Sequence, residues 1–112
     1  MAETFSNAKV QVTGNSEVDL LATVPSSTQR IVLSCLVTNV ITSTSAVDVT
    51  VKITDNSNTE LATIANTIPV PSDSAIELIP SKLVLATGDK LRVTSNNGSG
   101  NLDVVVSYLD IT

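Results

Sequence analysis

The chain has 112 residues and a formal net charge of −5, with 42% hydrophobic, 15% charged and only 2% aromatic residues. This length supports one domain with a single core, and the apolar content is typical of a globular chain. The six basic residues are scattered, which excludes the clustered positive face that nucleic-acid binding requires. No apolar run predicts a membrane span or a signal peptide. We therefore expect one domain, made and folded in a cytoplasm, without nucleic-acid or membrane partners.

The composition favours strands over helices. The chain contains 16 Val, 15 Thr and 14 Ser. Val and Thr are β-branched, so they lose rotamer freedom in a helix and fit a pleated sheet. Phe5 and Tyr108 are the only aromatic residues, which predicts an aliphatic and rather thin core. Because oligomerisation would add the burial that such a core lacks, we expect a homo-oligomer.

The N-terminal segment is polar, and apolar alternation begins only near residue 8. We predict an N-terminal arm over residues 1–9, a β-sandwich domain over residues 10–112, and a first strand near residues 8–13. Phe5 lies on the arm, where it can pack over the open end of its own domain or dock on a neighbouring subunit. We include Phe5 among the candidate interface residues.

A second strand is predicted near residues 18–24, and the next segment, residues 30–41, is apolar on both faces. Strict alternation places Ile31, Leu33, Cys35 and Val37 on one face and Val32, Leu36 and Val40 on the other. Such a strand is either covered on both sides or meets a partner with its second face. Because a two-layer sandwich leaves one face of each sheet in water, we favour a subunit interface at Val32, Leu36 and Val40.

Cys35 is the only cysteine, so the chain forms no intramolecular disulfide. It lies inside the apolar run of residues 31–37, where a buried thiol is the usual finding. We therefore predict an inert thiol rather than a reactive one.

The middle of the chain predicts a succession of antiparallel strands. Residues 46–54 alternate most regularly, with Val47, Val49, Val51 and Ile53 expected to point into the core. A turn at residues 55–58 leads to a return strand over residues 61–68. Three short apolar runs follow, at residues 75–79, 83–85 and 91–93. Prolines and the Gly88-Asp89 pair separate these runs, because proline cannot donate to a sheet ladder and Gly-Asp supplies turn geometry.

The C-terminal segment predicts a hairpin loop at residues 96–100 and a last strand. Leu102, Val104, Val106 and Tyr108 share one face of this strand. Leu109 and Ile111 occupy the other face, which a bulge near Ser107 would explain, and we add both to the candidate interface. In total, eight or nine strands predict an all-β fold, a single antiparallel β-sandwich of the jelly-roll or immunoglobulin-like type.

The sequence contains little that could carry catalysis. It has no histidine, which removes the commonest general base and metal ligand, and one cysteine cannot build a thiolate metal site. The acidic turn at residues 55–60 lacks the glycine and the terminal acid of a calcium loop. We therefore expect no enzyme, with no catalytic residue, no metal site and no cofactor.

Several segments together resemble small all-β virion proteins of tailed bacteriophages. The segments that carry the resemblance are Thr23-Val24-Pro25, the apolar run from residue 30, residues 47–55, Ile68-Pro69-Val70-Pro71 and residues 83–93 with the Gly88-Asp89 turn. They occur in the same order, and the likeness covers residues 16–112. The resemblance implies an all-β subunit built into a phage particle, with no catalytic residues to carry over.

The resemblance implies other virion proteins as partners and the virion as the location, after synthesis in the host cytoplasm. A capsid decoration subunit that stabilises the shell, in contact with the major capsid protein, is the first hypothesis. A tail, neck or fibre-attachment subunit is the second. A soluble carbohydrate-binding β-module is a third, although Tyr108 would be its only aromatic platform for a sugar apart from Phe5 on the arm.

Overall fold

The structure is a computed structural model that describes residues 2–40, 46–79, 81–96 and 102–112. These residues form nine β-strands and no helix. The strands are β1 (Glu3–Val12), β2 (Val18–Leu21), β3 (Gln29–Asn39), β4 (Val47–Thr54), β5 (Glu60–Val70), β6 (Ala75–Glu77), β7 (Leu83–Leu85), β8 (Lys90–Ser95) and β9 (Leu102–Ile111). Residue 1 of the predicted arm, residue 41 of the predicted third strand and most of the predicted loop at 96–100 lie outside the described residues.

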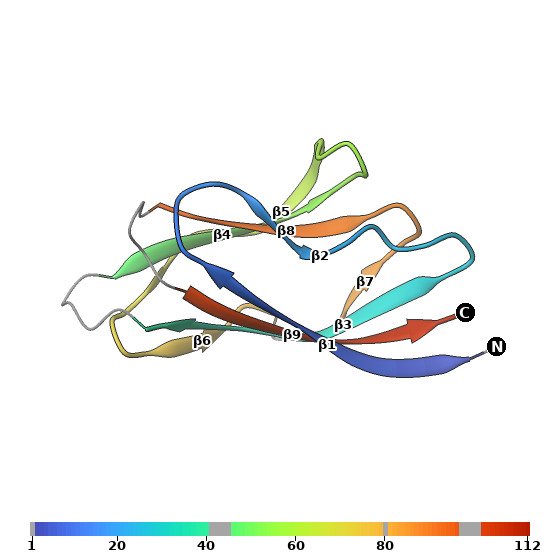
Figure 1. The fold of residues 1–112 in the computed structure, drawn as a ribbon, viewed down its shortest axis with the longest axis horizontal. Helices are drawn as coiled ribbons and strands as arrows, with labels where there is room; N and C mark the ends of the chain where they lie inside the picture. The colour runs from blue at the N-terminus through green and yellow to red at the C-terminus, as the bar shows by residue number, and fades with distance from the viewer. Residues whose placement is uncertain (1, 41–45, 80, 97–101) are drawn as a thin grey trace.

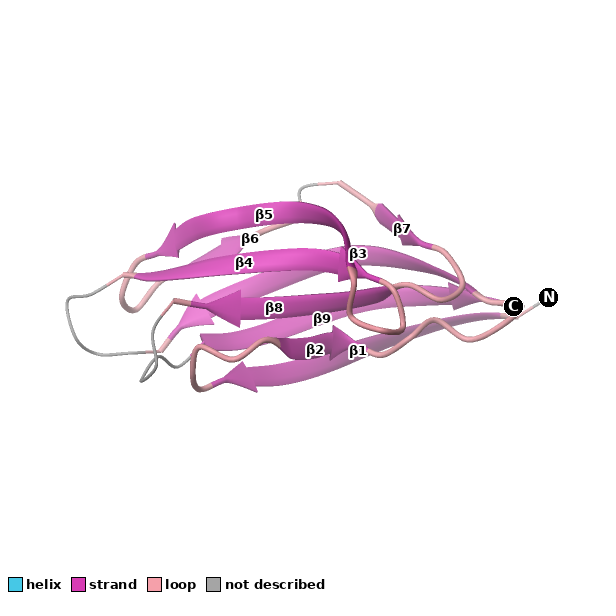
Figure 2. Ribbon diagram, turned by 90° about the horizontal axis from the view of Figure 1, so that it is seen from above, coloured by secondary structure: helices cyan, strands magenta, loops and turns pink. Residues whose placement is uncertain are grey.

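The strands form two antiparallel sheets that pack face to face (Figures 1 and 2). One sheet has the order β1-β9-β3-β6, with β7 also paired to β3, and the other has the order β2-β8-β4-β5. If β6 and β7 are counted as one interrupted strand, this order is that of an eight-stranded jelly roll. The predicted antiparallel β-sandwich is confirmed, and the strand order selects the jelly-roll alternative over the immunoglobulin-like one.

The core between the sheets is aliphatic, as the composition predicts. Val47, Val49 and Val51 on β4 are fully buried, which confirms the alternation expected for this strand, whereas Ile53 is only half-buried. Leucines from three other segments complete the centre of the core: Leu85, Leu91 and Leu102. No aromatic side chain is fully buried among the described residues.

A β-bulge in β3 changes which of its side chains face the core. The register between β3 and β9 shifts between Val32 and Ser34, so Leu33 is the extra residue. Val32 therefore lies on the same side as Cys35 and Val37, and all three are fully buried. The prediction that Val32 faces a partner is wrong, because one inserted residue reverses the alternation of a strand.

Glu77 completes the ladder next to this bulge. The edge beside β3 has no continuous strand there, since β6 ends at Glu77 and β7 begins only at Leu83, and both pair with β3. One carboxylate oxygen of Glu77, Oε2, accepts hydrogen bonds from the backbone N–H of Cys35 at 2.7 Å and of Ile79 at 2.9 Å. The side chain thus supplies an acceptor to backbone donors that the interrupted strand leaves without one.

β1 begins at Glu3 rather than near residue 8, and it pairs with β9 in unbroken register over its whole length. From Glu3 onward, the predicted N-terminal arm is therefore an edge strand of the sandwich. The bulge predicted near Ser107 belongs to β3 and not to β9, whose alternation is continuous. The first half of β1 shows no alternation of apolar and polar residues in the sequence, because its side chains are exposed on both faces.

We predict that Glu77→Ala lowers the free energy of unfolding by about 2 kcal/mol, because it leaves two backbone N–H groups without their acceptor. Glu77→Gln retains an acceptor oxygen and should cost clearly less. The measurement is urea unfolding followed by circular dichroism, with the exposed Glu60→Ala as the matched control. Equal stability of Glu77→Ala and Glu60→Ala would contradict the role assigned to the Glu77 carboxylate.

Candidate functional site

The outer face of the sheet that contains β1, β9 and β3 carries a row of hydrophobic side chains across four strands. Phe5 lies opposite Leu109, and Leu109 lies opposite Ile31. Ile31 in turn lies opposite Val84 on β7. Phe5 is 73% exposed and Val84 is 61% exposed, the highest values of any large hydrophobic residue in the described part of the chain. We call these four residues the apolar row.

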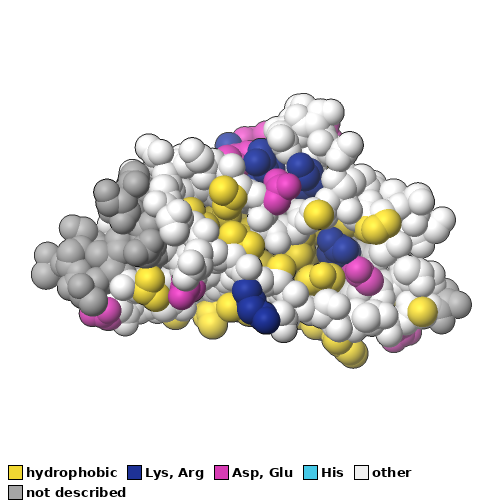
Figure 3. Space-filling view, viewed as in Figure 1, with side chains coloured by type: hydrophobic (Ala, Val, Ile, Leu, Met, Phe, Trp, Pro, Cys, Tyr) yellow, Lys and Arg dark blue, Asp and Glu magenta, His cyan; other side chains and the backbone are white. Residues whose placement is uncertain are grey.

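Further hydrophobic side chains extend this outer face. Val105 on β9 lies opposite Leu36 on β3, and both are exposed. Ile111 lies on the same face of β9 as Val105 and Leu109. Val40 is exposed immediately after the end of β3. Figure 3 shows hydrophobic side chains protruding along the lower border of the molecule, beneath β1 and β9. The polar residues Asn7, Ser107 and Ser34 lie between this group and the apolar row. Exposed hydrophobic side chains gathered on one sheet face are typical of a site of macromolecular contact.

The structure brings together most of the predicted interface residues. Phe5, Leu36, Leu109 and Ile111 lie on this outer face, Val40 lies just beyond the end of β3, and Val32 lies in the core. Sequence reasoning misses Ile31, Val84 and Val105. Strict alternation assigns Ile31 to the core because it does not include the bulge. A signal for the other two is present, since each is the middle residue of three consecutive hydrophobic residues on a strand.

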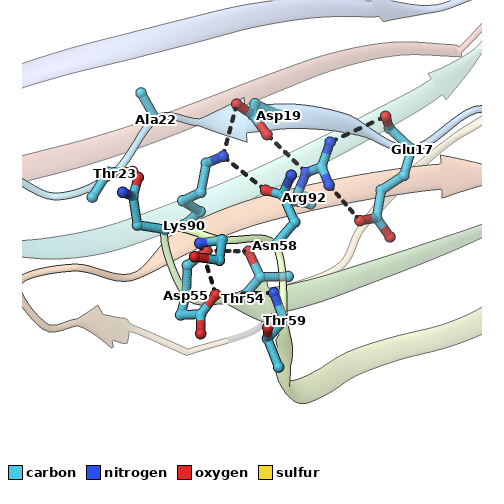
Figure 4. Close-up of polar contacts among 12 residues, drawn as sticks. Glu17, Asp19, Ala22, Thr23, Thr54, Asp55, Asn58, Thr59, Lys90 and Arg92 are labelled. Carbon is cyan, nitrogen blue, oxygen red and sulfur yellow. Dashed lines mark hydrogen bonds and ion pairs between the residues drawn. The ribbon is translucent and has the colours of Figure 1, made fainter.

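The outer face of the second sheet is charged and internally paired (Figure 4). Arg92 contacts Glu17 at 2.8 Å and Asp19 at 2.7 Å, and Lys90 contacts Asp19 at 3.4 Å. Lys52 on β4 joins Glu17 at 3.7 Å and Glu60 on β5 at 3.2 Å. The hydrogen bonds to Lys52 and Thr63 hold the pKa of the Glu60 carboxyl below its ordinary value.

This network links strands of one sheet and pairs each of its cations. Its three cations, on β8 and β4, face three carboxylates, so the basic side chains are neutralised within the chain. Exposed ion pairs contribute little stability individually, yet together they keep this face polar. The two outer faces of the sandwich therefore differ: one carries a network of paired charges, and the other carries exposed hydrophobic side chains.

A second ion pair lies at the end of the core. The Arg30 guanidinium donates to both carboxylate oxygens of Asp110, at 2.7 and 3.0 Å, and to the carbonyl oxygen of Ala22 at 3.2 Å. The hydrogen bond to Asp110 raises the pKa of Arg30 above its ordinary value, although burial opposes this shift. Arg30 also lies 4.6 Å from the centre of the Tyr108 ring. One face of the tyrosine is thus occupied by a cation and is not free to stack on a sugar.

The described residues hold no arrangement suited to catalysis or metal binding. No group of three or more His, Cys, Asp or Glu side chains among them could hold a metal ion. The sequence does contain one Ser-x-x-Lys spacing, at Ser6 and Lys9, a pattern that in some enzymes pairs a serine with a lysine base. Both residues lie on β1, where residues three apart point to opposite faces, so the Lys9 amine cannot reach the Ser6 hydroxyl.

The surface depressions are shallow. One of about 340 Å³ is lined by Ser27, Thr28, Gln29, Thr87, Ile111 and Thr112. Its lining contains no charged side chain. In the part of the chain that is described, no helix has the length and hydrophobicity to cross a bilayer.

No protein-family model matches the sequence, and no curated protein is detectably similar to it. Solved structures do share the fold. The chain is similar to a capsid structure of Helicobacter pylori bacteriophage KHP30, with a TM-score of 0.58 and 14% identity over 99% of this chain and 98% of that one. It is also similar to a chain of infectious bursal disease virus strain Gx, with a TM-score of 0.58 and 10% identity over 98% of this chain.

The chain spans about a third of the bursal disease virus chain, 33%, but nearly all of the phage chain. A protein of the disulfide-linked pili that form Bacillus endospore appendages matches as well, with a TM-score of 0.54 and 14% identity over 100% of this chain and 91% of that one. At these identities the likeness establishes the jelly-roll fold alone. The same fold also occurs in lectin domains and cupins, so function must be argued from surfaces.

Cys35 is fully buried in the core, as predicted. Burial, together with the nearby Glu77 carboxylate, raises the pKa of its thiol to about 12, because the thiolate charge is unfavourable in the core and beside a second negative charge. The predicted inert thiol thus has a physical cause, since the thiolate is the reactive form.

We predict that a thiol reagent modifies Cys35 very slowly in the folded protein at pH 8, where roughly 1 thiol in 10⁴ would be ionised for a pKa near 12. In denaturing urea the reaction should reach the rate of an ordinary cysteine. The measurement is the time course of labelling by mass spectrometry. Labelling of the folded protein as fast as of the unfolded protein would contradict the assigned burial and pKa.

Proposed function

We propose that this chain is a non-enzymatic structural subunit of a virus particle, which binds other virion proteins through the apolar outer face of its first sheet. The apolar row carries this proposal: Phe5, Leu109, Ile31 and Val84 form a hydrophobic band across four strands, in which Phe5 and Val84 are exposed and the two residues between them are half-buried. Burial of an exposed Phe or Val side chain contributes on the order of 2 kcal/mol. Several such side chains on a preformed sheet can hold a subunit in place without any reaction chemistry.

Two further observations support an assembly role. The fold likeness includes a phage capsid structure that this chain matches over nearly the full length of both chains. The opposite outer face is charged, balanced and suited to water, so one side of a bound subunit can face solvent while the other docks. A surface subunit of a shell needs this polarity between its two faces.

Within this proposal, the specific position is decoration of a tailed-phage capsid, in contact with the major capsid protein. A tail, neck or fibre-attachment position is the alternative, and copy number distinguishes the two, because a decorated shell carries far more copies than a tail or neck. The carbohydrate-binding alternative is disfavoured by the Arg30 guanidinium that occupies one face of Tyr108.

The experiment is incorporation of tagged variants into particles that are purified by density gradient from a host that produces them. Val84→Asp places a charge in the apolar row and should abolish incorporation, whereas the protein remains folded because Val84 is exposed. Leu61→Asp on β5 is the matched control, since Leu61 is a similarly exposed hydrophobic residue, at 56%, on the other sheet. It should incorporate normally.

Quantitative mass spectrometry of the same particles gives the copy number. Absence of the wild-type chain from the particles would overturn the proposed function. Normal incorporation of Val84→Asp together with loss of Leu61→Asp would overturn the assignment of the docking face. Both variants are first compared with the wild type by circular dichroism.

A further inference from the structure

β1 presents a free edge with a regular set of hydrogen-bonding groups. Ala2 and Thr112 exchange both of their backbone hydrogen bonds, at 3.1 and 2.9 Å. Because pairs alternate along an antiparallel ladder, the even-numbered residues of β1 bond to β9 and the odd-numbered ones point their N–H and C=O groups outward. The outward groups belong to Glu3, Phe5, Asn7, Lys9 and Gln11. β1 has no other strand beside it in the described structure.

The other sheet edges are protected in ways that β1 is not. β2 has four residues, and β6 and β7 have three each. β5 is long, but it contains Pro69, its register with β4 shifts three times, and Thr67 has a positive φ of 48°. β1 has ten residues, no proline and no register shift. Short strands, prolines and bulges are the usual protection against edge-to-edge pairing, so β1 is the one long unprotected edge of the described sandwich.

The charges on β1 are complementary to a second copy of the same strand. Glu3 and Lys9 are its only charged residues, both lie on the outer face, and neither makes an ion pair with another described residue. In an antiparallel pair centred on Ser6, Glu3 of each copy lies opposite Lys9 of the other. The outward odd-numbered groups then meet one another, as the ladder requires.

The surroundings of Ser6 leave room for this pairing. Thr4 and Ser6 point to the inner side of the sheet and yet are exposed, so the second sheet does not cover this half of β1. The same register places the two copies of Phe5 on the outer face as diagonal neighbours, within reach of aromatic side chains. The apolar row of one copy would continue into that of the other, and Phe5 would be partly covered.

We propose that two copies of this chain pair antiparallel through β1, in the register centred on Ser6, and form one continuous sheet across the dimer. This dimer deepens the proposed function, because it names a second copy as one partner of the structural subunit. Its failure is distinguishable from failure of that function, since a monomeric chain can still dock on a particle through Val84.

The first experiment is analytical ultracentrifugation of the full chain. The wild type should sediment as a dimer, and Glu3→Lys or Lys9→Glu alone should weaken the dimer roughly tenfold or more, because each creates two like-charge pairs. The double variant Glu3→Lys/Lys9→Glu should restore it, since each pair then has opposite charges again. The control Lys82→Glu, off the edge strand, should leave the dimer unchanged.

The second experiment reads the register by oxidative cross-linking. Ser6→Cys should form an intermolecular disulfide, because Ser6 faces itself across a non-hydrogen-bonded pair where Cα atoms are about 4.5 Å apart. Thr4→Cys and Asn7→Cys are matched controls that would face Ala8 and Phe5 of the second copy and should not cross-link efficiently. Buried Cys35 does not contribute.

A monomer at every concentration up to the millimolar range would overturn the dimer. If the double variant Glu3→Lys/Lys9→Glu does not regain the dimer, the register centred on Ser6 is wrong. Cross-linking through Asn7→Cys in place of Ser6→Cys would likewise overturn this register. Circular dichroism of each variant confirms that β1 changes leave the fold intact, since the altered side chains are exposed.

Discussion

The single extra residue in β3, Leu33, determines which side chains of this central strand face the core and which face outward. Without the bulge, strict alternation would place Ile31 on the core side with Cys35, and Val32 on the outer side with Leu36. With it, Val32 and Cys35 both fill the core, and Ile31 and Leu36 both point outward. The Glu77 carboxylate supplies the hydrogen-bond acceptor at the interrupted neighbouring strand position, next to the bulge. The bulge thus determines which hydrophobic residues of β3 fill the core and which of them lie on the outer face.

The two outer faces carry different kinds of side chain, although both arise from the alternation of residues along the strands. On the second sheet, Arg92 and Lys52 are matched by carboxylates within the chain, so the cations of that face are paired internally. On the first sheet, Phe5 and Val84 stand exposed at opposite ends of a hydrophobic row. The paired charges and the exposed hydrophobic side chains thus lie on different sheets of the sandwich. The free edge of β1 borders the sheet that carries the hydrophobic row.

Much of the fold follows from the sequence, because alternation in residues 46–54 and the turn signals at Gly88-Asp89 are local properties. The bulge cannot be predicted from the local sequence, because the residues around Leu33 are hydrophobic in either alternation. Pairing with β9 determines which alternation the strand adopts. Leu36 and Leu109, which the sequence pattern places away from the core, do lie on one outer face of the sheet, and whether that face is an interface stays a prediction. The strand character of residues 3–7 could not be predicted, since an edge strand exposed on both faces has no hydrophobic period.

The most direct test is residue-level labelling of the hydrophobic side chains by a photoactivated carbene, in the free protein and in purified particles. If the outer face of the first sheet docks, Phe5, Leu109 and Val84 lose most of their labelling on assembly, while Leu61 on the second sheet keeps its own. The opposite pattern, in which the apolar row stays labelled in the particle and the charged face is protected, would contradict the account.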